Sequence, residues 1–385
     1  MGPSSHIPSN LSDGITAALS SLLDRGWQPA DVVHLVRRHL TQRASRLALA
    51  AVAQHSRTTD APHRAPLAWV AQLEALGVYQ RSDDRIVGGH PDIVPRWAKA
   101  EKLHPDDAHD EAAEVYRVLA VAPSLEPIGT PPQQWGATNI GLAADTPLPD
   151  VDDKVLRTIR ALLAKAEGTE FEAEADAFTA KAQELMTRHS IDLAMLAAAA
   201  HSPGGTPGVV AKRIHLESPY ADEKSAFLAT IAEVNGVKCV WSQWCGFNTL
   251  IGFPIDLQLT EVLFTSLLVQ ATQASNVATA RDRRLSTPSF KRAFIVSYAD
   301  RIAERLHEAH THTNAQATAH YGSALAPVLA SKQEAVDAAF HAAFPDVTYA
   351  RQRSYNAAGW WAGRAAADRA DLGTGAALPR PSKGG

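Results

Sequence analysis

Residues 154–192 read KVLRTIRALLAKAEGTEFEAEADAFTAKAQELMTRHSID, and this stretch carries the strongest structural signal in the chain. Apolar residues recur at spacings of three and four on both sides of Gly168, which predicts two amphipathic helices. The two apolar stripes are Val151, Val155, Ile159, Leu162 and Ala166, then Phe171, Ala175, Phe178, Ala182 and Leu185. Because the connection between them is short, we expect the helices to lie antiparallel, as a hairpin over 152–189.

The residues around the turn of this hairpin are acidic. Thr169 followed by Glu172 has the form of a capping box at the start of the second helix. The carboxylates of Glu170, Glu172, Glu174 and Asp176 alternate along a helix and therefore point apart, so we predict that they favour the helix start and hold no cation. After Ser190, the run IDLAMLAAAA predicts a short third helix.

The sequence motifs of the hairpin resemble those of a known family. The motifs are R-x-L-L-A-K-A-E over residues 160–167 and A-x-E-L-M-x-R-H over residues 182–189. They resemble the bacterial and phage family catalogued as the domain of unknown function number twenty-seven eighty-six. The following region, 209–372, looks like the domain of unknown function number seventy-one sixty-eight, on CVWSQWCGFNTLIGF, LTEVLFTSLLVQA, SFKRAFIVSYADRI and GWWAGRAAADRA. The resemblance implies a fold and boundaries, and it transfers no catalytic residue.

The chain divides into blocks around the hairpin. Helical periodicity fills residues 1–122, whereas residues 123–150 contain six prolines and three glycines without any period and predict a linker. We therefore expect a helical bundle over 1–122, a linker over 123–150, a hairpin domain over 151–200, an α+β domain over 209–373 and a disordered tail over 374–385. The predicted fold class is α+β and predominantly helical.

The α+β domain combines a small antiparallel sheet with long helices. The expected strands are VVAKRIHL, VKCVWSQW and FNTLIGF, and the expected helices cover 221–235, 256–279, 289–310, 331–344 and 356–371.

Composition excludes several classes of protein. The net charge of −4, with 45% hydrophobic and 20% charged residues, is that of a folded globular chain and excludes a collagen-like fibre. Two cysteines, Cys239 and Cys245, cannot form a four-cysteine zinc site; we expect them to be reduced and buried. There is no apolar run near 18 residues and no signal peptide, which argues against a membrane location and favours the cytoplasm.

Motifs for common chemistry are missing from the sequence. It contains no G-x-S-x-G, no G-x-x-x-x-G-K-[ST] and no G-x-G-x-x-G, so we predict no cofactor and identify no reaction. The run HEAHTH places His307, His310 and His312 together, but the spacing is not H-E-x-x-H, and we expect surface histidines at a fraying helix end and no metal. The pair of helices over 12–40 has helix-turn-helix dimensions, yet its second helix opens with Pro29, Ala30, Asp31 and Val32, which offer no donor to a base edge.

The basic stretch RDRRLSTPSFKR, residues 281–292, is the best signal for a partner. It has a net charge of +4 and lies between two predicted long helices, the second of which Ser289 is expected to cap. We predict that this loop contacts phosphates through Arg281, Arg283, Arg284, Lys291 and Arg292. A second basic cluster, around the closing helix, contains Arg351, Arg353, Arg364 and Arg369.

The sequence therefore predicts a cytoplasmic, modular protein that binds an anionic partner, with RNA or DNA ahead of a small phosphate compound. Two alternatives stay open. One is a hydrolase with its site between the β-hairpin and the C-terminal helices, and the other is a protein-interaction adaptor that uses the two helical blocks.

Overall fold

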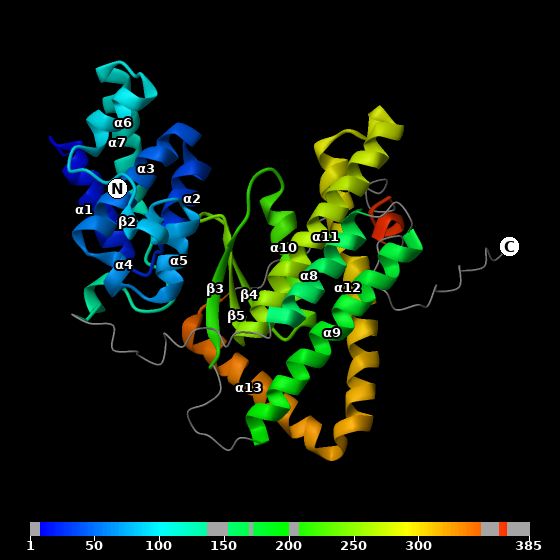
Figure 1. Ribbon diagram of the computed structural model, residues 1–385. Coiled ribbons are helices and arrows are strands. Elements are labelled where there is room, and N and C mark those ends of the chain that lie inside the picture. The colour runs from blue at the N-terminus through cyan, green and yellow to red at the C-terminus, as the bar shows by residue number, and fades with distance from the viewer. Residues whose placement is uncertain (1–7, 137–152, 169–171, 200–207, 348–361, 368–385) are drawn as a thin grey trace. The chain divides into compact units, whose positions relative to one another are not determined.

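The computed structural model describes residues 8–136, 153–168, 172–199, 208–347 and 362–367 (Figure 1). The chain separates into two compact units, Met1–Pro147 with Ser242–Gly246, and Leu148–Trp241 with Phe247–Gly385. The described residues form the thirteen α-helices α1 to α13, a further helical segment at 362–367 and two small antiparallel sheets. This confirms the predicted α+β, predominantly helical fold. The predicted tail, 374–385, lies outside the described residues.

The first unit is a helical bundle, which agrees with the predicted fold class. Its helices are α1 (Leu11–Asp24), α2 (Pro29–His39), α3 (Gln42–Thr58), α4 (Ala61–Arg64), α5 (Leu67–Ala75), α6 (Ile93–Glu101) and α7 (Pro105–Val121). A two-residue ladder joins β1 (Tyr79–Gln80) to β2 (Arg85–Ile86), and single 3₁₀ turns cover Arg81–Asp83 and Pro132–Gln134.

The beginning of the proline-rich stretch lies against this bundle. Trp27 Nε1 donates to the carbonyl oxygen of Pro123 at 2.7 Å, and Gln28 Nε2 donates to that of Ile128 at 2.8 Å. Trp135 is buried and meets Trp69 edge to face. Residues 123–136 are thus attached to the first unit, while 137–150 lie outside the described residues.

The sheet of the second unit has the strand order β3-β5-β4. Its strands are β3 (Val210–His215), β4 (Lys238–Ser242) and β5 (Phe247–Gly252), close to the predicted ones. β3 runs antiparallel to β5, with Val210 opposite Gly252 and His215 opposite Phe247. The central strand β5 is buried along its whole length, and Figure 1 shows α10, α11 and α12 to one side of the sheet.

The helices of the second unit are α8 (Asp153–Gly168), α9 (Glu172–Ala199), α10 (Ala221–Val234), α11 (Pro254–Arg281), α12 (Pro288–Tyr321) and α13 (Leu325–Ala343). Residues 362–367 are also helical, within the predicted last helix.

Three helix boundaries were predicted wrongly, one of them the start of α13, which lies at Leu325 and not at residue 331. The separate helix after Ser190 does not exist, because α9 continues without a break to Ala199; residues 190–199 contain no glycine or proline and are rich in good helix formers. The helix α12 passes the expected end at residue 310 because residues 311–321 contain no glycine or proline, and it stops only before Gly322, whose φ is 64°.

The hairpin is confirmed as two helices, and its core also includes α11. Buried residues of the hairpin core are Leu156, Ile159, Leu163, Ala182 and Met186 of the hairpin with Ile255 and Leu259 of α11. Val155, Leu162 and Leu185, which were expected in the centre, are only partly buried around it. The buried face of α8 is shifted from the predicted stripe because the helix packs on two partners, α9 and α11. The predicted cap of Thr169 lies outside the described residues, as do Val151 and Phe171 and the side chains of the four acidic residues that follow.

We expect Ile159→Ala to destabilise the second unit by about 2–5 kcal/mol, because the side chain is fully buried and its removal leaves a cavity. The matched control is Arg160→Ala, an exposed neighbour that should change stability by less than about 0.5 kcal/mol. Urea unfolding followed by circular dichroism measures both. Equal midpoints for the two variants would contradict the packing described here.

Candidate functional site

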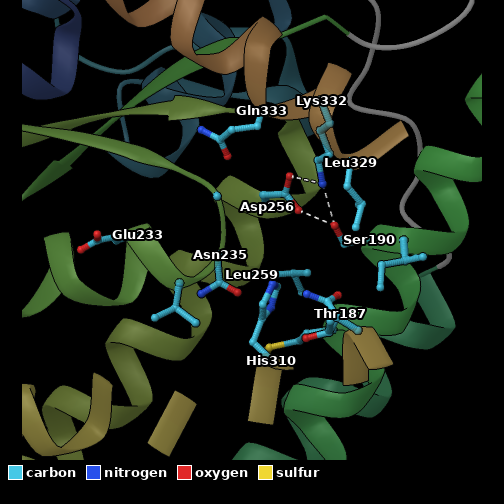
Figure 2. A pocket seen from close by; sticks show the side chains of 15 residues that line it. Thr187, Ser190, Glu233, Asn235, Asp256, Leu259, His310, Leu329, Lys332 and Gln333 are labelled. Atoms are coloured by element: carbon cyan, nitrogen blue, oxygen red, sulfur yellow. Dashed lines mark hydrogen bonds and ion pairs between the residues drawn. The ribbon is translucent and has the colours of Figure 1, made fainter. Parts of the chain in front are cut away.

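Three polar side chains from three helices meet in the second unit (Figure 2). Lys332 of α13 lies with its Nζ 2.7 Å from Asp256 Oδ2 of α11, and donates to Ser190 Oγ of α9, also at 2.7 Å. Ser190 Oγ in turn donates to Asp256 Oδ1 at 2.7 Å. We call Ser190, Asp256 and Lys332 the polar triad. It joins the hairpin to two helices of the following region.

The polar triad is largely removed from solvent. The side chain of Asp256 is 4% exposed and that of Lys332 is 19% exposed. A buried charge is tolerated only when it is paired and hydrogen-bonded, and each oxygen of Asp256 faces one of the two partners. Asp256 also follows Pro254 in the first turn of α11, where the helix dipole favours a negative charge.

The directions of these hydrogen bonds limit the chemistry of Ser190. Its proton is directed to Asp256, and the ammonium of Lys332 occupies a lone pair of its oxygen. A serine nucleophile needs an adjacent base that takes its proton, and the group that accepts the proton of Ser190 is the carboxylate of Asp256, which is also paired with Lys332. In this arrangement the polar triad fixes three helices.

A cavity of about 220 Å³ adjoins the polar triad. Its remaining wall comes from α9, the end of α10 and its turn, α11, α12 and α13: Met186, Thr187, Ile191, Glu233, Val234, Asn235, Gly236, Leu259, His310, Asn314, Leu329 and Gln333. Figure 2 shows side chains from these separate segments around one space. Among the described residues, two buried atoms of this wall, His310 Nδ1 and Asn314 Oδ1, have no hydrogen-bond partner.

His310 is the member of the HEAHTH run that reaches this cavity. Burial lowers the pKa of His310, and the nearby His307 and Lys332 lower it further, against a smaller opposing effect of Asp256. His307 and His312 are exposed, and His312 Nε2 lies 3.0 Å from Gln316 Nε2. The three histidines therefore do not converge. They also lie inside α12, so the predicted fraying helix end was wrong. In the described part of the chain, no group of three or more His, Cys, Asp or Glu side chains is arranged to hold a metal ion.

The last residues of the hairpin motif form one wall of this region. Tyr321, at the end of α12, donates its hydroxyl to Asp192 Oδ1 of α9 at 2.6 Å. In the sequence, Ser190 and Asp192 belong to the end of the hairpin stretch, and nothing there marks them as part of a polar site. Sequence reasoning missed the polar triad because its members are 66 and 142 positions from Ser190, and no short motif links them.

The predicted phosphate-binding residues lie at the junction of α11 and α12. Arg281 ends α11, and Arg283 and Arg284 belong to a 3₁₀ turn, Arg283–Leu285. Arg281, Arg284 and Arg292 are exposed and Lys291 is half-buried, while the side chain of Arg283 is outside the described ones. Arg292 Nε lies 3.6 Å from Glu223 Oε1.

The cap of the helix after this loop differs from the expected one. Thr287, and not Ser289, accepts the backbone N–H of Phe290 at 3.2 Å, and α12 begins at Pro288. Proline suits the first helical position because it has no N–H to satisfy there.

The other candidate residues have structural partners. Asp31 is 1% exposed and accepts the backbone N–H of Gln28, the N-cap of α2, as the third helical residue of a capping box does. Of the second basic cluster, Arg364 donates to Glu304 at 3.1 Å, while Arg351, Arg353 and Arg369 lie outside the described residues.

Both cysteines are free thiols. Burial raises the pKa of Cys239 to about 12, so this thiol stays protonated, and it accepts a hydrogen bond from Asn248 Nδ2 at 2.9 Å. Cys245 is 3% exposed.

Residues 154–193 match the model of a family described as "Protein of unknown function (DUF2786)". The match covers the hairpin, including Ser190, and agrees with the resemblance noted in the sequence. No curated protein and no solved structure matches the chain. Among the described residues, no helix has the length and apolar character to cross a bilayer.

We expect Lys332→Met to destabilise the second unit by about 3–5 kcal/mol, because it leaves the carboxylate of Asp256 buried without its counter-charge. Adding Asp256→Asn should recover much of that loss. The control Lys181→Met breaks an exposed pair with Glu184 and should cost less than about 1 kcal/mol. Urea unfolding of the two single variants and the double variant gives the coupling energy. Additive effects would show that the two charges do not depend on each other.

The lowered pKa of His310 predicts a dependence of stability on pH. Because the pKa of His310 is lower in the folded protein than the ordinary value of 6.5, the unfolded chain takes up a proton first as the pH falls below about 6.5. Stability should therefore decrease below that pH, and less so in His310→Gln. The difference between variant and parent isolates His310, because His55, whose pKa burial also lowers, is present in both. Urea midpoints over a pH series, with the exposed His312→Gln as control, provide the measurement. Parallel curves for parent and His310→Gln would refute the assignment.

Proposed function

We propose that the second unit binds the phosphates of an anionic partner, RNA or DNA, through the basic loop of residues 281–292. The observation that carries the proposal is the state of its cationic side chains. Among the described residues, Arg281, Arg284 and Lys291 have no carboxylate within ion-pair distance. Charges left without an internal partner are available to phosphate oxygens.

The acidic side chains near the loop leave this charge largely uncompensated. Asp282 is the acidic residue of the stretch, and its Oδ1 accepts the backbone N–H of Arg284 at 2.9 Å. The contact between Arg292 and Glu223 is long, at 3.6 Å, and the arginine side chain is 58% exposed, so the pair is a weak one. The loop also precedes the N-terminus of α12, where the helix dipole favours anions.

The proposal includes two expectations from the sequence. It takes residues 209–372 as a domain similar to the DUF7168 family, and it takes the protein as a bacterial cytoplasmic one. The hydrolase and adaptor alternatives make different use of the second unit. A hydrolase would use the cavity beside the polar triad, and an adaptor would need no charged loop.

Replacing Arg281, Arg284 and Lys291 together by Ala should weaken binding about equally for all sequences. Because up to three phosphate contacts are lost, the slope of log affinity against log salt should flatten by up to roughly three units. Fluorescence anisotropy with short labelled RNA and DNA over a salt series measures both effects.

The matched control removes three exposed cations of the first unit, Arg85, Arg96 and Lys99, which lowers the net charge equally. This control should bind as the parent does. No binding by the parent at low salt, or equal losses in both triple variants, would contradict the proposal and favour the hydrolase or the adaptor.

A further inference from the structure

The exposed face of α8 carries a row of basic residues. Between residues 154 and 165 the sequence has four basic residues and no acidic one. Lys154, Arg157 and Lys165 lie at positions i, i+3 and i+11, which places them on one side of the helix. All three are exposed, and the fourth, Arg160, is exposed on the same helix.

A shallow groove of about 570 Å³ follows this row. Its described lining is Lys154, Arg157, Thr158, Ala161, Leu162 and Lys165. Leu162 is half-buried and packs against the hairpin core, so the floor of the groove is in contact with that core. The Nζ atom of Lys165 lies 5.3 Å from the centre of the Phe178 ring, which places this charge over α9. The groove therefore has a floor that packs against the hairpin core and a basic rim.

From these observations we infer that the α8 groove is a second nucleic-acid contact, which holds the backbone of an RNA or DNA strand. The inference rests on the proposed function for the nature of the partner and adds a separate surface to it. Along the helix axis, Lys154 and Lys165 are about 16 Å apart. A single phosphate cannot reach both, whereas a strand with repeated phosphates neutralises several cations at once.

The occupant is a nucleic acid and not an anionic membrane. A helix that lies on a membrane inserts large apolar side chains beside its basic ones. Of the large apolar residues of α8, Leu156, Ile159 and Leu163 are buried in the core, and Leu162, which lines the groove, is half-buried against that core. The groove offers cations, the Thr158 hydroxyl and a small Ala161, which suits a polar backbone.

The test compares Lys154→Ala, Arg157→Ala and Lys165→Ala, combined in one groove variant, with the loop variant described above. Both are titrated as full chains with labelled oligouridine and oligothymidine of increasing length. We expect the groove variant to bind long oligonucleotides at least about tenfold more weakly, with a flatter salt slope, and to lose the gain in affinity that the parent shows with length. The groove variant should keep the circular dichroism spectrum of the parent and a cooperative melt. A charge-preserving variant, Lys154→Arg with Lys165→Arg, should bind like the parent and excludes a loss caused by misfolding.

The two proposals fail in different ways. A groove variant that binds like the parent, while the loop variant is weakened, overturns the groove and leaves the loop. A weakened groove variant beside an unchanged loop variant supports the groove and overturns the loop. Binding to phosphatidylserine vesicles without binding to either oligonucleotide would overturn the groove as a nucleic-acid contact.

Discussion

The apolar contact between the helical hairpin and α11 is the constraint on which the second unit depends. Ile159 and Met186 are buried in a core that α8 and α9 share with Ile255 and Leu259 of α11. Each such side chain contributes about 1.5–3 kcal/mol when it leaves water, so a hairpin without α11 would lose a large part of its stability. The stretch that matches the DUF2786 family is therefore one layer of a larger folded body.

The polar triad lies beside this apolar contact and fixes how the helices are positioned along one another. Apolar packing tolerates small shifts of one helix along another, whereas an ion pair and two hydrogen bonds of 2.7 Å do not. Ser190 thus holds the end of the hairpin in register with Asp256 and Lys332. With its buried face fixed in this way, the hairpin presents the opposite, basic face of α8 to solvent.

Local sequence pattern predicted the elements well and their long-range contacts poorly. The hairpin and the three strands follow from periodicities of 3.6 and 2, which depend on neighbouring residues only. The uninterrupted α9 and the length of α12 were missed, because Ser190 and His310 were taken as ends although no glycine or proline follows closely. The polar triad could not be predicted, since its residues meet only through tertiary packing. The sequence drew attention to His310 only as part of the HEAHTH run. In the structure His310 lines the cavity, and the other two histidines of the run do not.

The central claim is that the second unit contacts nucleic acid through two basic surfaces, the α8 groove and the loop of residues 281–292. Photocrosslinking of a labelled oligonucleotide to the full chain, followed by mass spectrometry of the peptides, tests it most directly. The account predicts cross-links within residues 154–165 and 281–292 that disappear as salt is raised. Cross-links confined to the first unit, or none at low salt, would contradict it.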